Sequence, residues 1–325
     1  MADHYYVGVD LGGTNIKAGL LDDKAKVLTK FSLPTEVDKG TDQVVRNITN
    51  AVERAITDAG VDRQKVAGAG IGSPGPLSHR RGVIINPGNL PCMKNVPICE
   101  LVHGQTGIRS TLENDANAAA FGEYWAGAGK GVTDLVMFTL GTGVGGGVIT
   151  EGRLLRGHFE NGAELGHTLV NPGGRQCSCG QLGCVEAYSS AHFLARHAED
   201  LIRQGRPSTL KAKVDAGETL MAEHIIDAAK ASDTIAQEVW DAACYYLAVT
   251  IVTMQHVINP ERVVLAGGLI AAGDFLLEPV RKKFRELTWK LLDDFPEIIF
   301  ATLGNDAGFI GAAGCAWHAH QTDDW

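Results

Sequence analysis

The sequence lacks the features that would direct it to nucleic acid, to a membrane or out of the cell. It has no run of Lys and Arg, and its formal net charge is −9, so nothing indicates a basic surface for nucleic acid. The N-terminus has no basic segment followed by an apolar core, which argues against a secretory signal. The most apolar stretch, residues 242–257, is shorter than the roughly 20 residues that span a bilayer, so we expect a buried core helix there.

Aromatic residues are few, at 6%, and prolines number 11 against 40 glycines. Hydrophobic residues make up 45% and charged residues 21%, as in a folded enzyme, and 325 residues are enough for two domains. The glycine excess predicts many sites where the backbone turns tightly or approaches a ligand closely. The seven cysteines are an odd number. Without a signal peptide, that count predicts reduced thiols in a cytoplasmic protein.

Two segments repeat one pattern, in which a strand leads into a glycine-rich turn and then a second strand. Residues 5–10 are predicted to form a strand before Leu11-Gly12-Gly13-Thr14, and residues 16–21 resume strand character. Residues 134–140, 141–147 and 148–150 follow the same order. The repetition predicts an α/β fold in two similar halves with a cleft between them. Residues 189–255 have a mostly helical pattern, and residues 307–320 are predicted to form a closing helix.

The two glycine tips could hold phosphate, because glycine lets backbone N–H groups line a concave surface. Asp10 ends the first strand, where its carboxylate could orient hydrated Mg²⁺. Ordinary hairpin turns would explain either tip alone equally well. Two other nucleotide motifs are not supported. The G-x-G-x-x-G at Gly141 precedes a strand rather than a helix, and Gly131 replaces the Ser or Thr of a P-loop.

The segment Glu113-Asn114-Asp115-Ala116-Asn117 lies between a predicted strand, residues 108–112, and an Ala-rich helix. Asn and Asp are preferred helix N-caps, so capping alone could explain these residues. A carboxylate at a helix N-terminus is also held ionised and oriented, and it could accept a proton from a substrate hydroxyl. Such a weak base suffices for phosphoryl transfer, because the loose transition state depends mainly on positioning and charge neutralisation.

One histidine and three cysteines gather within residues 164–186. His167, Cys177, Cys179 and Cys184 supply one nitrogen and three sulfurs, a set suited to tetrahedral Zn²⁺, although the spacing is not that of a usual zinc finger. Scattered free thiols are the alternative, but cysteines this close in a reducing compartment usually share a role. Four protein ligands leave no open position for a catalytic water, so we expect the zinc to be structural.

Together these segments resemble the ROK family of sugar kinases and repressors. The resemblance is carried by Asp10-Leu11-Gly12-Gly13-Thr14-Asn15, Glu113-Asn114-Asp115-Ala116-Asn117-Ala118-Ala119, Leu140-Gly141-Thr142-Gly143-Val144-Gly145-Gly146-Gly147, Glu164-Leu165-Gly166-His167 and Cys177-Ser178-Cys179-Gly180-Gln181-Leu182-Gly183-Cys184-Val185-Glu186. It runs from about residue 5 to residue 315, and the cysteine motif combined with Glu-x-Gly-His is its most specific part. Within the family the chain is most similar to bacterial members that phosphorylate glucose.

The resemblance implies a duplicated actin-like ATPase (ribonuclease H-like) fold with ATP between two domains. The N-terminal domain would comprise residues 1–118 and 307–325, and the C-terminal domain residues 119–306 with the zinc loop 164–186. Asp115 would be the catalytic base that takes the proton of the sugar 6-hydroxyl. The residues implied to contact the sugar are Asn89, Asn114, Asp115, Glu164, His167 and Glu186. Those implied to bind Mg-ATP are Asp10, Gly12, Gly13, Thr14, Lys17, Thr142, Gly143, Gly267 and Gly268.

The expected activity is therefore ATP-dependent phosphorylation of a hexose, first of all glucose, by a cytoplasmic homodimer. N-acetylmannosamine, N-acetylglucosamine, mannose, fructose and allose are alternative acceptors, and ADP or polyphosphate are alternative donors. Asn89-Leu90-Pro91-Cys92-Met93 stands where many glucose-phosphorylating members carry a tryptophan, which leaves the shape of the sugar pocket open. A repressor needs an N-terminal helix-turn-helix, and only nine residues precede Asp10. A non-catalytic sugar sensor would lose the base or a phosphate tip, and this sequence has all of them.

Overall fold

The structure is a computed structural model that describes residues 4–291 and 294–325. The chain divides into two compact units. Unit 1 comprises the chain up to Val132, Gly147–Ala163 and Thr302–Trp325, and unit 2 comprises Thr133–Gly146 and Glu164–Ala301. The expected boundary after residue 118 falls inside helix α3 (Asp115–Ala126), which belongs to unit 1 throughout. Residues 147–163 also belong to unit 1, although the sequence placed them in the second domain.

Unit 1 is built on a five-stranded sheet with the order β3-β2-β1-β4-β7. Its strands are β1 (Tyr5–Leu11), β2 (Asn15–Asp22), β3 (Val27–Pro34), β4 (Val66–Ser73) and β7 (Ser110–Asn114). The first three are antiparallel neighbours, whereas β4 pairs in parallel with both β1 and β7. The carboxyl ends of β1, β4 and β7 therefore lie at one edge of the sheet, which is where Asp10 and Asn114 are found. A short hairpin of β5 (Leu77–Ser78) and β6 (Val83–Ile84) also belongs to this unit.

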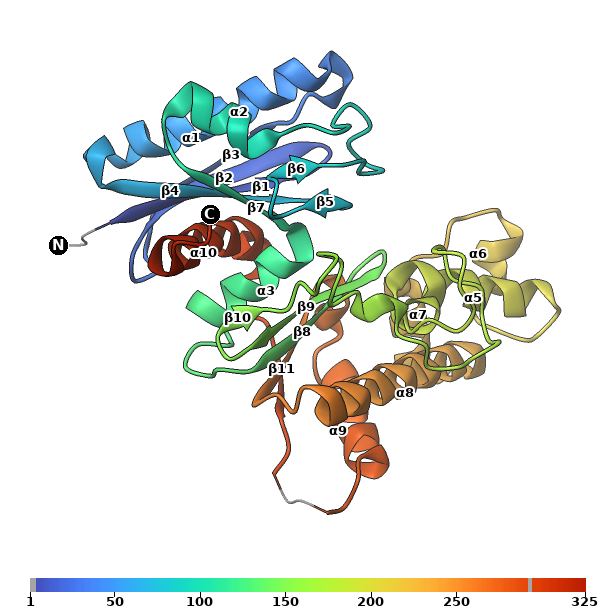
Figure 1. The fold of residues 1–325 in the computed structure, drawn as a ribbon. Coiled ribbons are helices and arrows are strands. Elements are labelled where there is room, and N and C mark those ends of the chain that lie inside the picture. Colours follow the sequence, from blue (N-terminus) through green and yellow to red (C-terminus); the bar gives the residue numbers. More distant parts are fainter. Residues whose placement is uncertain (1–3, 292–293) are drawn as a thin grey trace. The chain divides into compact units, whose positions relative to one another are not determined.

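Helices cover both faces of this sheet. Figure 1 shows α1 (Thr41–Ala59) and α2 (Ile98–Thr106) on one face and α10 (Ala307–Thr322) on the other. The closing helix that the sequence predicts is thus confirmed. Small residues let it pack close to the strands, because a Cβ on Gly70 of β4 would lie 1.7 Å from the carbonyl oxygen of Ala312. Helix α3 packs against α10 on the same side.

A buried carboxylate links the chain near two of the four places where it passes between unit 1 and unit 2. Glu123 of α3 has no exposed surface. It accepts hydrogen bonds from the N–H groups of Ala128 (2.7 Å), Thr302 (3.0 Å) and Leu303 (2.7 Å). Ala128 lies shortly before the chain first leaves unit 1, and Thr302 is where it returns for the last time. This contact explains why α3 and the residues just before α10 belong to one unit.

The second sheet has the order β10-β9-β8-β11-β12. Its strands are β8 (Leu135–Leu140), β9 (Val144–Thr150), β10 (Arg153–Leu154), β11 (Arg262–Ala266) and β12 (Glu297–Phe300). Strand β11 pairs in parallel with β8 and with β12, and β10 pairs antiparallel with β9. In both sheets a glycine tip thus joins two consecutive strands, and the first of them pairs in parallel with a later strand, β1 with β4 and β8 with β11. This repetition agrees with the two similar halves that the sequence predicts.

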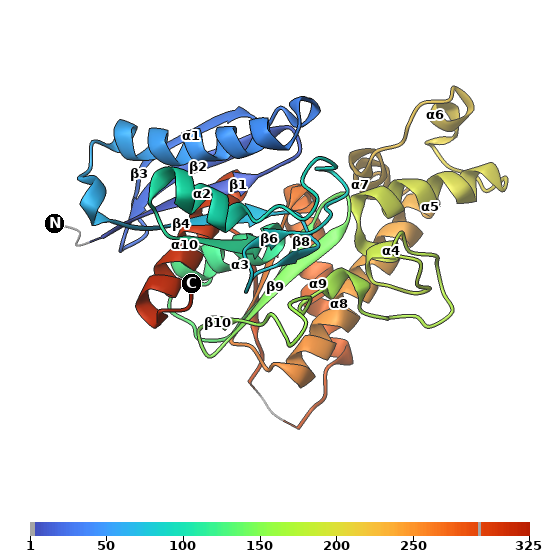
Figure 2. The same cartoon turned by 45° about the horizontal axis from the view of Figure 1, so that its top comes forward.

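The α-helices described in unit 2 are α4 (Glu186–Ser189), α5 (Ala191–Arg203), α6 (Lys211–Asp215), α7 (Ala222–Lys230), α8 (Thr234–Val257) and α9 (Asp274–Leu287). Figures 1 and 2 show α8 beside α9. The apolar stretch 242–257 forms most of α8, and Leu247 and Ile251 are buried there, so the expected core helix is confirmed. None of the described helices is both long and apolar enough to cross a membrane.

Candidate active site

The first glycine tip joins β1 to β2 in unit 1 and is held by hydrogen bonds. The N–H of Gly12 donates to the carbonyl oxygen of Asn15 (3.1 Å), and the Thr35 hydroxyl donates to the carbonyl oxygen of Gly12 (2.6 Å). A Cβ on Gly13 would lie 3.0 Å from the carbonyl oxygen of Asn89. Gly13, which is expected to bind phosphate, and Asn89, which is expected to bind sugar, therefore lie next to each other.

Asp10 and Asp115, the two acidic residues expected to serve catalysis, are half-buried in unit 1. Burial raises the pKa of Asp115, and the hydrogen bond from the Ala116 N–H to its Oδ1 (2.8 Å) opposes that rise. Burial also raises the pKa of Asp10, the negative charge of Asp115 raises it further, and Lys17 opposes both effects. The sheet register accounts for this influence, because Asp10 is paired with Gly72 of β4 and Gly72 is paired with Glu113 of β7. Asp115 follows two residues after Glu113, at the same edge of the sheet. Lys17 itself donates from Nζ to the carbonyl oxygen of Asn305 (3.1 Å).

Asn114 is the N-cap of α3. Its Oδ1 accepts hydrogen bonds from the N–H groups of Ala116 (2.9 Å) and Asn117 (3.2 Å). The capping explanation offered by the sequence therefore holds for Asn114, and the cap uses its Oδ1 rather than its side-chain NH₂ group. Asp115 is the first residue of the helix, where the helix dipole favours the ionised form of its carboxyl group.

The sequence pattern does not indicate a buried ion pair that involves Glu113, two residues before Asp115. The Oε2 of Glu113 accepts a hydrogen bond from the Nε of Arg156 (2.7 Å). Its Oε1 accepts from the N–H of Asn114 (3.0 Å) and from the Nδ2 of Asn117 (3.0 Å). The Glu113 side chain is 3% exposed and that of Arg156 21%. Glu113 therefore holds the first turn of α3 through Asn114 and Asn117, and Arg156 neutralises the charge of the Glu113 carboxylate.

Replacing Arg156 with Met should lower the free energy of unfolding by about 3 kcal/mol, because it leaves the Glu113 carboxylate buried without its partner. Adding Glu113→Gln should recover most of that loss, since the neutral amide can still accept from Asn114 and Asn117. Urea denaturation followed by circular dichroism measures both effects. A single variant as stable as the parent chain would contradict the assignment of this ion pair as a buried, stabilising contact.

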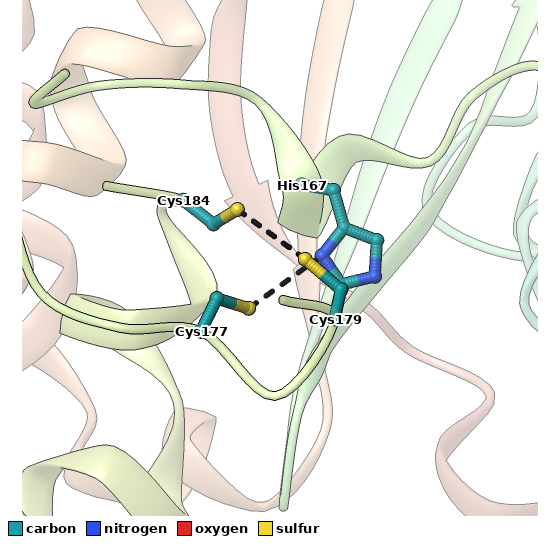
Figure 3. A group of neighbouring side chains, drawn as sticks. All are labelled: His167, Cys177, Cys179 and Cys184. Atoms are coloured by element: carbon teal, nitrogen blue, oxygen red, sulfur yellow. Dashed lines mark hydrogen bonds between the residues drawn. The ribbon is translucent and has the colours of Figure 1, made fainter. Parts of the chain in front are cut away.

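In unit 2, His167, Cys177, Cys179 and Cys184 point toward a common centre (Figure 3). Their ligand atoms all lie within 4.8 Å of one another. The Sγ atoms of Cys179 and Cys184 are 3.7 Å apart, and the Sγ of Cys177 lies 3.8 Å from the Nδ1 of His167. Tetrahedral zinc with bonds of about 2.3 Å to sulfur requires ligand atoms about 3.8 Å apart. The four residues therefore fit zinc, and Nδ1 is the ring nitrogen that faces the site.

The close approach of the three cysteine sulfur atoms favours a bound cation at this site. Burial raises the pKa of Cys184 to about 12, and the neighbouring Cys179 and Cys177 contribute to that rise. Zinc would stabilise the Cys184 thiolate, which burial and these contacts disfavour. The loop that carries them has its own supports, since Leu169 and Gln176 form backbone bridges with Cys184 and Leu182. We therefore expect the surrounding chain to keep its fold when the site is empty.

The second glycine tip, in unit 2, contributes to a pocket of about 540 Å³. Gly141 and Thr142 line it from the tip, and Gly268 lines it from the turn after β11. The sequence did not indicate the remaining walls, which include Met221, Ile226, Leu269, Glu223, Asp227 and Lys230. Gly267 does not line the pocket but precedes Gly268 with a left-handed φ of 89°.

The expected sugar-contacting residues of unit 2 flank the same tip. Glu186 begins α4 and accepts a hydrogen bond from the N–H of Val144 (3.0 Å). Glu164 precedes a single helical turn, residues 165–167, and its carbonyl oxygen accepts from the N–H of His167 (3.1 Å). Asn89, Asn114 and Asp115 belong to unit 1, whereas Glu164, His167 and Glu186 belong to unit 2.

The sequence and fold match those of known proteins along nearly the whole chain. The ROK family model matches residues 6–319. A glucokinase from Halalkalibacterium halodurans is 37% identical over all of this chain and 97% of its own length. A glucokinase from Thermotoga maritima is 37% identical over 94% of this chain and 95% of its own length. An N-acetylmannosamine kinase from Salmonella typhi is 31% identical over 94% and 96%.

Solved structures agree with these relatives. A ROK hexokinase from Thermus thermophilus is 34% identical, with a TM-score of 0.82 over 99% of this chain and all of that one. A ROK family glucokinase from Streptomyces griseus, in complex with glucose and AMPPNP, is 33% identical, with a TM-score of 0.74 over 97% and 99%. The expected actin-like ATPase fold is thereby confirmed, and a sugar kinase activity is supported.

Proposed function

The chain belongs to the ROK family and is a sugar kinase, and from this premise we propose that it transfers the γ-phosphoryl group of Mg-ATP to the 6-hydroxyl of glucose. The observation that carries the proposal is that Asp10 and Asp115, both half-buried, lie at the same edge of the sheet of unit 1, and that Asp10 leads directly into the first glycine tip. One would orient hydrated Mg²⁺ and the other would accept the proton of the attacking hydroxyl. The magnesium that enters with ATP supplies charge neutralisation for the phosphates.

In this proposal Asp115 acts as general base. As the sugar oxygen forms its bond to the γ-phosphorus, the bond to the β-phosphate oxygen breaks, and the hydroxyl proton moves to the Asp115 carboxylate. Burial raises the pKa of this carboxyl group, so it binds a proton more strongly than an exposed aspartate would. The cap formed by Asn114 and the support from Glu113 hold the helix end that carries it. Most of the rate enhancement would come from that positioning.

The other sugar hydroxyls would bind Asn89 and Asn114 from unit 1 and Glu164, His167 and Glu186 from unit 2. His167 directs Nδ1 toward Cys177, which leaves Nε2 for a sugar hydroxyl. Zinc bound by His167 and the three cysteines would fix the imidazole in that orientation. Its role would be structural, because the four protein ligands complete a tetrahedron.

The pocket beside the second tip supports a nucleotide as the phosphate donor. Met221, Ile226 and Leu269 give it apolar walls suited to a purine base. Glu223 and Asp227 could accept hydrogen bonds from ribose hydroxyls, and they outnumber Lys230 among its charged residues. Since two carboxylates would repel a bare polyphosphate chain, we favour ATP over polyphosphate.

A second acceptor has support of its own. An N-acetylmannosamine kinase is 31% identical to this chain over nearly its full length. Asn89-Leu90-Pro91-Cys92-Met93 also lacks the tryptophan found at this place in many relatives that phosphorylate glucose. N-acetylmannosamine is therefore the alternative substrate. A homodimeric state and a cytoplasmic location stay predictions from the resemblance and from the cysteine content.

The test measures formation of the sugar phosphate from hexoses and N-acetylhexosamines, with ATP, ADP and polyphosphate as donors. When ATP is the donor, an ADP-release assay follows the same reaction. We expect turnover with ATP and the highest kcat/KM for glucose. Highest turnover with N-acetylmannosamine would select the alternative substrate, and turnover with polyphosphate alone would contradict the nucleotide assignment. Sugar binding without turnover on any donor would indicate a sensor instead of a kinase.

A further inference from the structure

The carboxylate of Glu186 holds together two loops of unit 2 that have separate expected roles. Its Oε2 accepts a hydrogen bond from the N–H of Val144 (3.0 Å), in the second glycine tip. Its Oε1 accepts from the hydroxyl of Ser178 (2.8 Å), which stands between the metal-site residues Cys177 and Cys179. Glu186 is only 8% exposed, so water competes little for its oxygens.

The glycine tip is fixed at both ends by the segment that begins at Glu186. At one end Val144 donates to the Glu186 carboxylate, and at the other the N–H of Ala191 donates to the carbonyl oxygen of Gly141 (2.8 Å). The contact is close, because a Cβ on Gly143 would lie 2.5 Å from Glu186 Oε2. A change in the orientation of Glu186 would therefore move the tip that lines the nucleotide pocket.

Each oxygen of a carboxylate can accept more than one hydrogen bond, so Glu186 can keep both partners and still bind a sugar hydroxyl. A sugar bound there would restrict the carboxylate to the orientation that also holds Val144. The tip would then be ordered before the phosphates arrive. Because coupling between two ligands is reciprocal, bound nucleotide would favour sugar by the same factor.

We propose that Ser178 is a positioning residue that, through Glu186 and Val144, couples sugar binding to nucleotide binding in unit 2. The proposal rests on the proposed function, since it assumes that Glu186 contacts the sugar. Among the described residues, the Oε1 of Glu186 has one other side-chain partner, the Sγ of Cys177 (3.4 Å), which could not donate a hydrogen bond as a zinc-bound thiolate. Removal of the Ser178 hydroxyl would therefore let the carboxylate turn away from the tip. Ser178 is not among the residues expected to contact either substrate, so its effect should appear in the coupling rather than in either affinity alone.

Calorimetric titration of AMPPNP with and without saturating glucose measures this coupling. In the parent protein, glucose should tighten AMPPNP binding at least fivefold, the lower end of typical couplings. Ser178→Ala should reduce that factor to about 1–2, with zinc content and AMPPNP affinity in the absence of sugar unchanged. Ser178→Thr, which keeps the hydroxyl, should restore it. Gln176→Ala is the matched control. In the described part of the chain, the Gln176 side chain donates to the backbone carbonyl oxygens of Cys177 and Gln181 in the same loop, so coupling should persist.

Three results would overturn the proposal: no coupling in the parent protein, equal coupling in Ser178→Ala, or loss of coupling in Ser178→Thr and Gln176→Ala as well. Loss of coupling in all three variants would mean that any substitution that destabilises the loop removes the coupling, whether or not it affects the Ser178 hydroxyl. A parent protein that phosphorylates a hexose in the ADP-release assay but gives one of these results would leave the proposed function intact. Absence of turnover on every sugar would instead refute the proposed function itself.

Discussion

Asp115→Asn is expected to lower kcat by at least about 10²-fold, the effect of removing a positioned general base. Asparagine has nearly the same shape, and its oxygen can still accept the N–H of Ala116, so the helix end should keep its structure. The KM for the sugar should change little, because the lost interaction forms mainly in the transition state. Steady-state kinetics by ADP release gives both constants.

The matched control is Asp42→Asn, because Asp42 is an exposed aspartate in the first turn of another helix, α1. That variant should turn over at the parental rate. If Asp115→Asn keeps more than about a tenth of the parental kcat, Asp115 is not the base, and the capping explanation of this segment is sufficient.

The pH dependence of kcat gives a second reading of the same residue. A base must be ionised to act, so activity falls as the pH drops through its pKa. Burial raises the pKa of Asp115, and burial together with the charge of Asp115 raises that of Asp10. The acid limb of the kcat profile should therefore lie above the ordinary aspartate value of about 3.9. A limb at or below that value would contradict the buried environment.

Cys179→Ser should remove the zinc and weaken sugar binding by at least about tenfold. With the metal gone, only the weak contact with the Cys177 Sγ (3.8 Å) directs His167 Nδ1 toward the cysteines, so the imidazole can rotate and Nε2 loses its fixed direction. Circular dichroism should change little, because two contacts still support the loop. The Nδ2 of Asn171 donates to the Tyr188 hydroxyl (2.9 Å), and the backbone bridges remain. Mass spectrometry for zinc and calorimetry for glucose measure the two effects.

Cys99→Ser serves as the control, since this half-buried thiol lies in unit 1, apart from the metal-site residues. It should retain one zinc per chain and bind glucose with the parental affinity. A zinc-free Cys179→Ser protein that binds and phosphorylates sugar normally would refute a supporting role for the metal.

Local sequence was sufficient wherever a feature depends on neighbouring residues. The glycine tips, the strands that enter them and the cap at Asn114 each follow from a few consecutive side chains whose conformational preferences agree. Cys177, Cys179 and Cys184 lie so close in the chain that a short loop brings them together, and only His167 comes from slightly further away. The apolar residues of α8 could be assigned to the core because the stretch is too short to span a bilayer.

The tertiary structure alone decided the contacts between distant segments. Arg156 meets Glu113 across 43 positions of sequence, and Val144 meets Glu186 across 42. No periodicity or propensity indicates such pairings, because they depend on where the packed sheets and helices place each chain end. The extent of unit 1 was decided in the same way, by the buried carboxylate of Glu123, which ties α3 to the residues before α10. Sequence determined which groups could perform the chemistry, and packing determined which of them support one another.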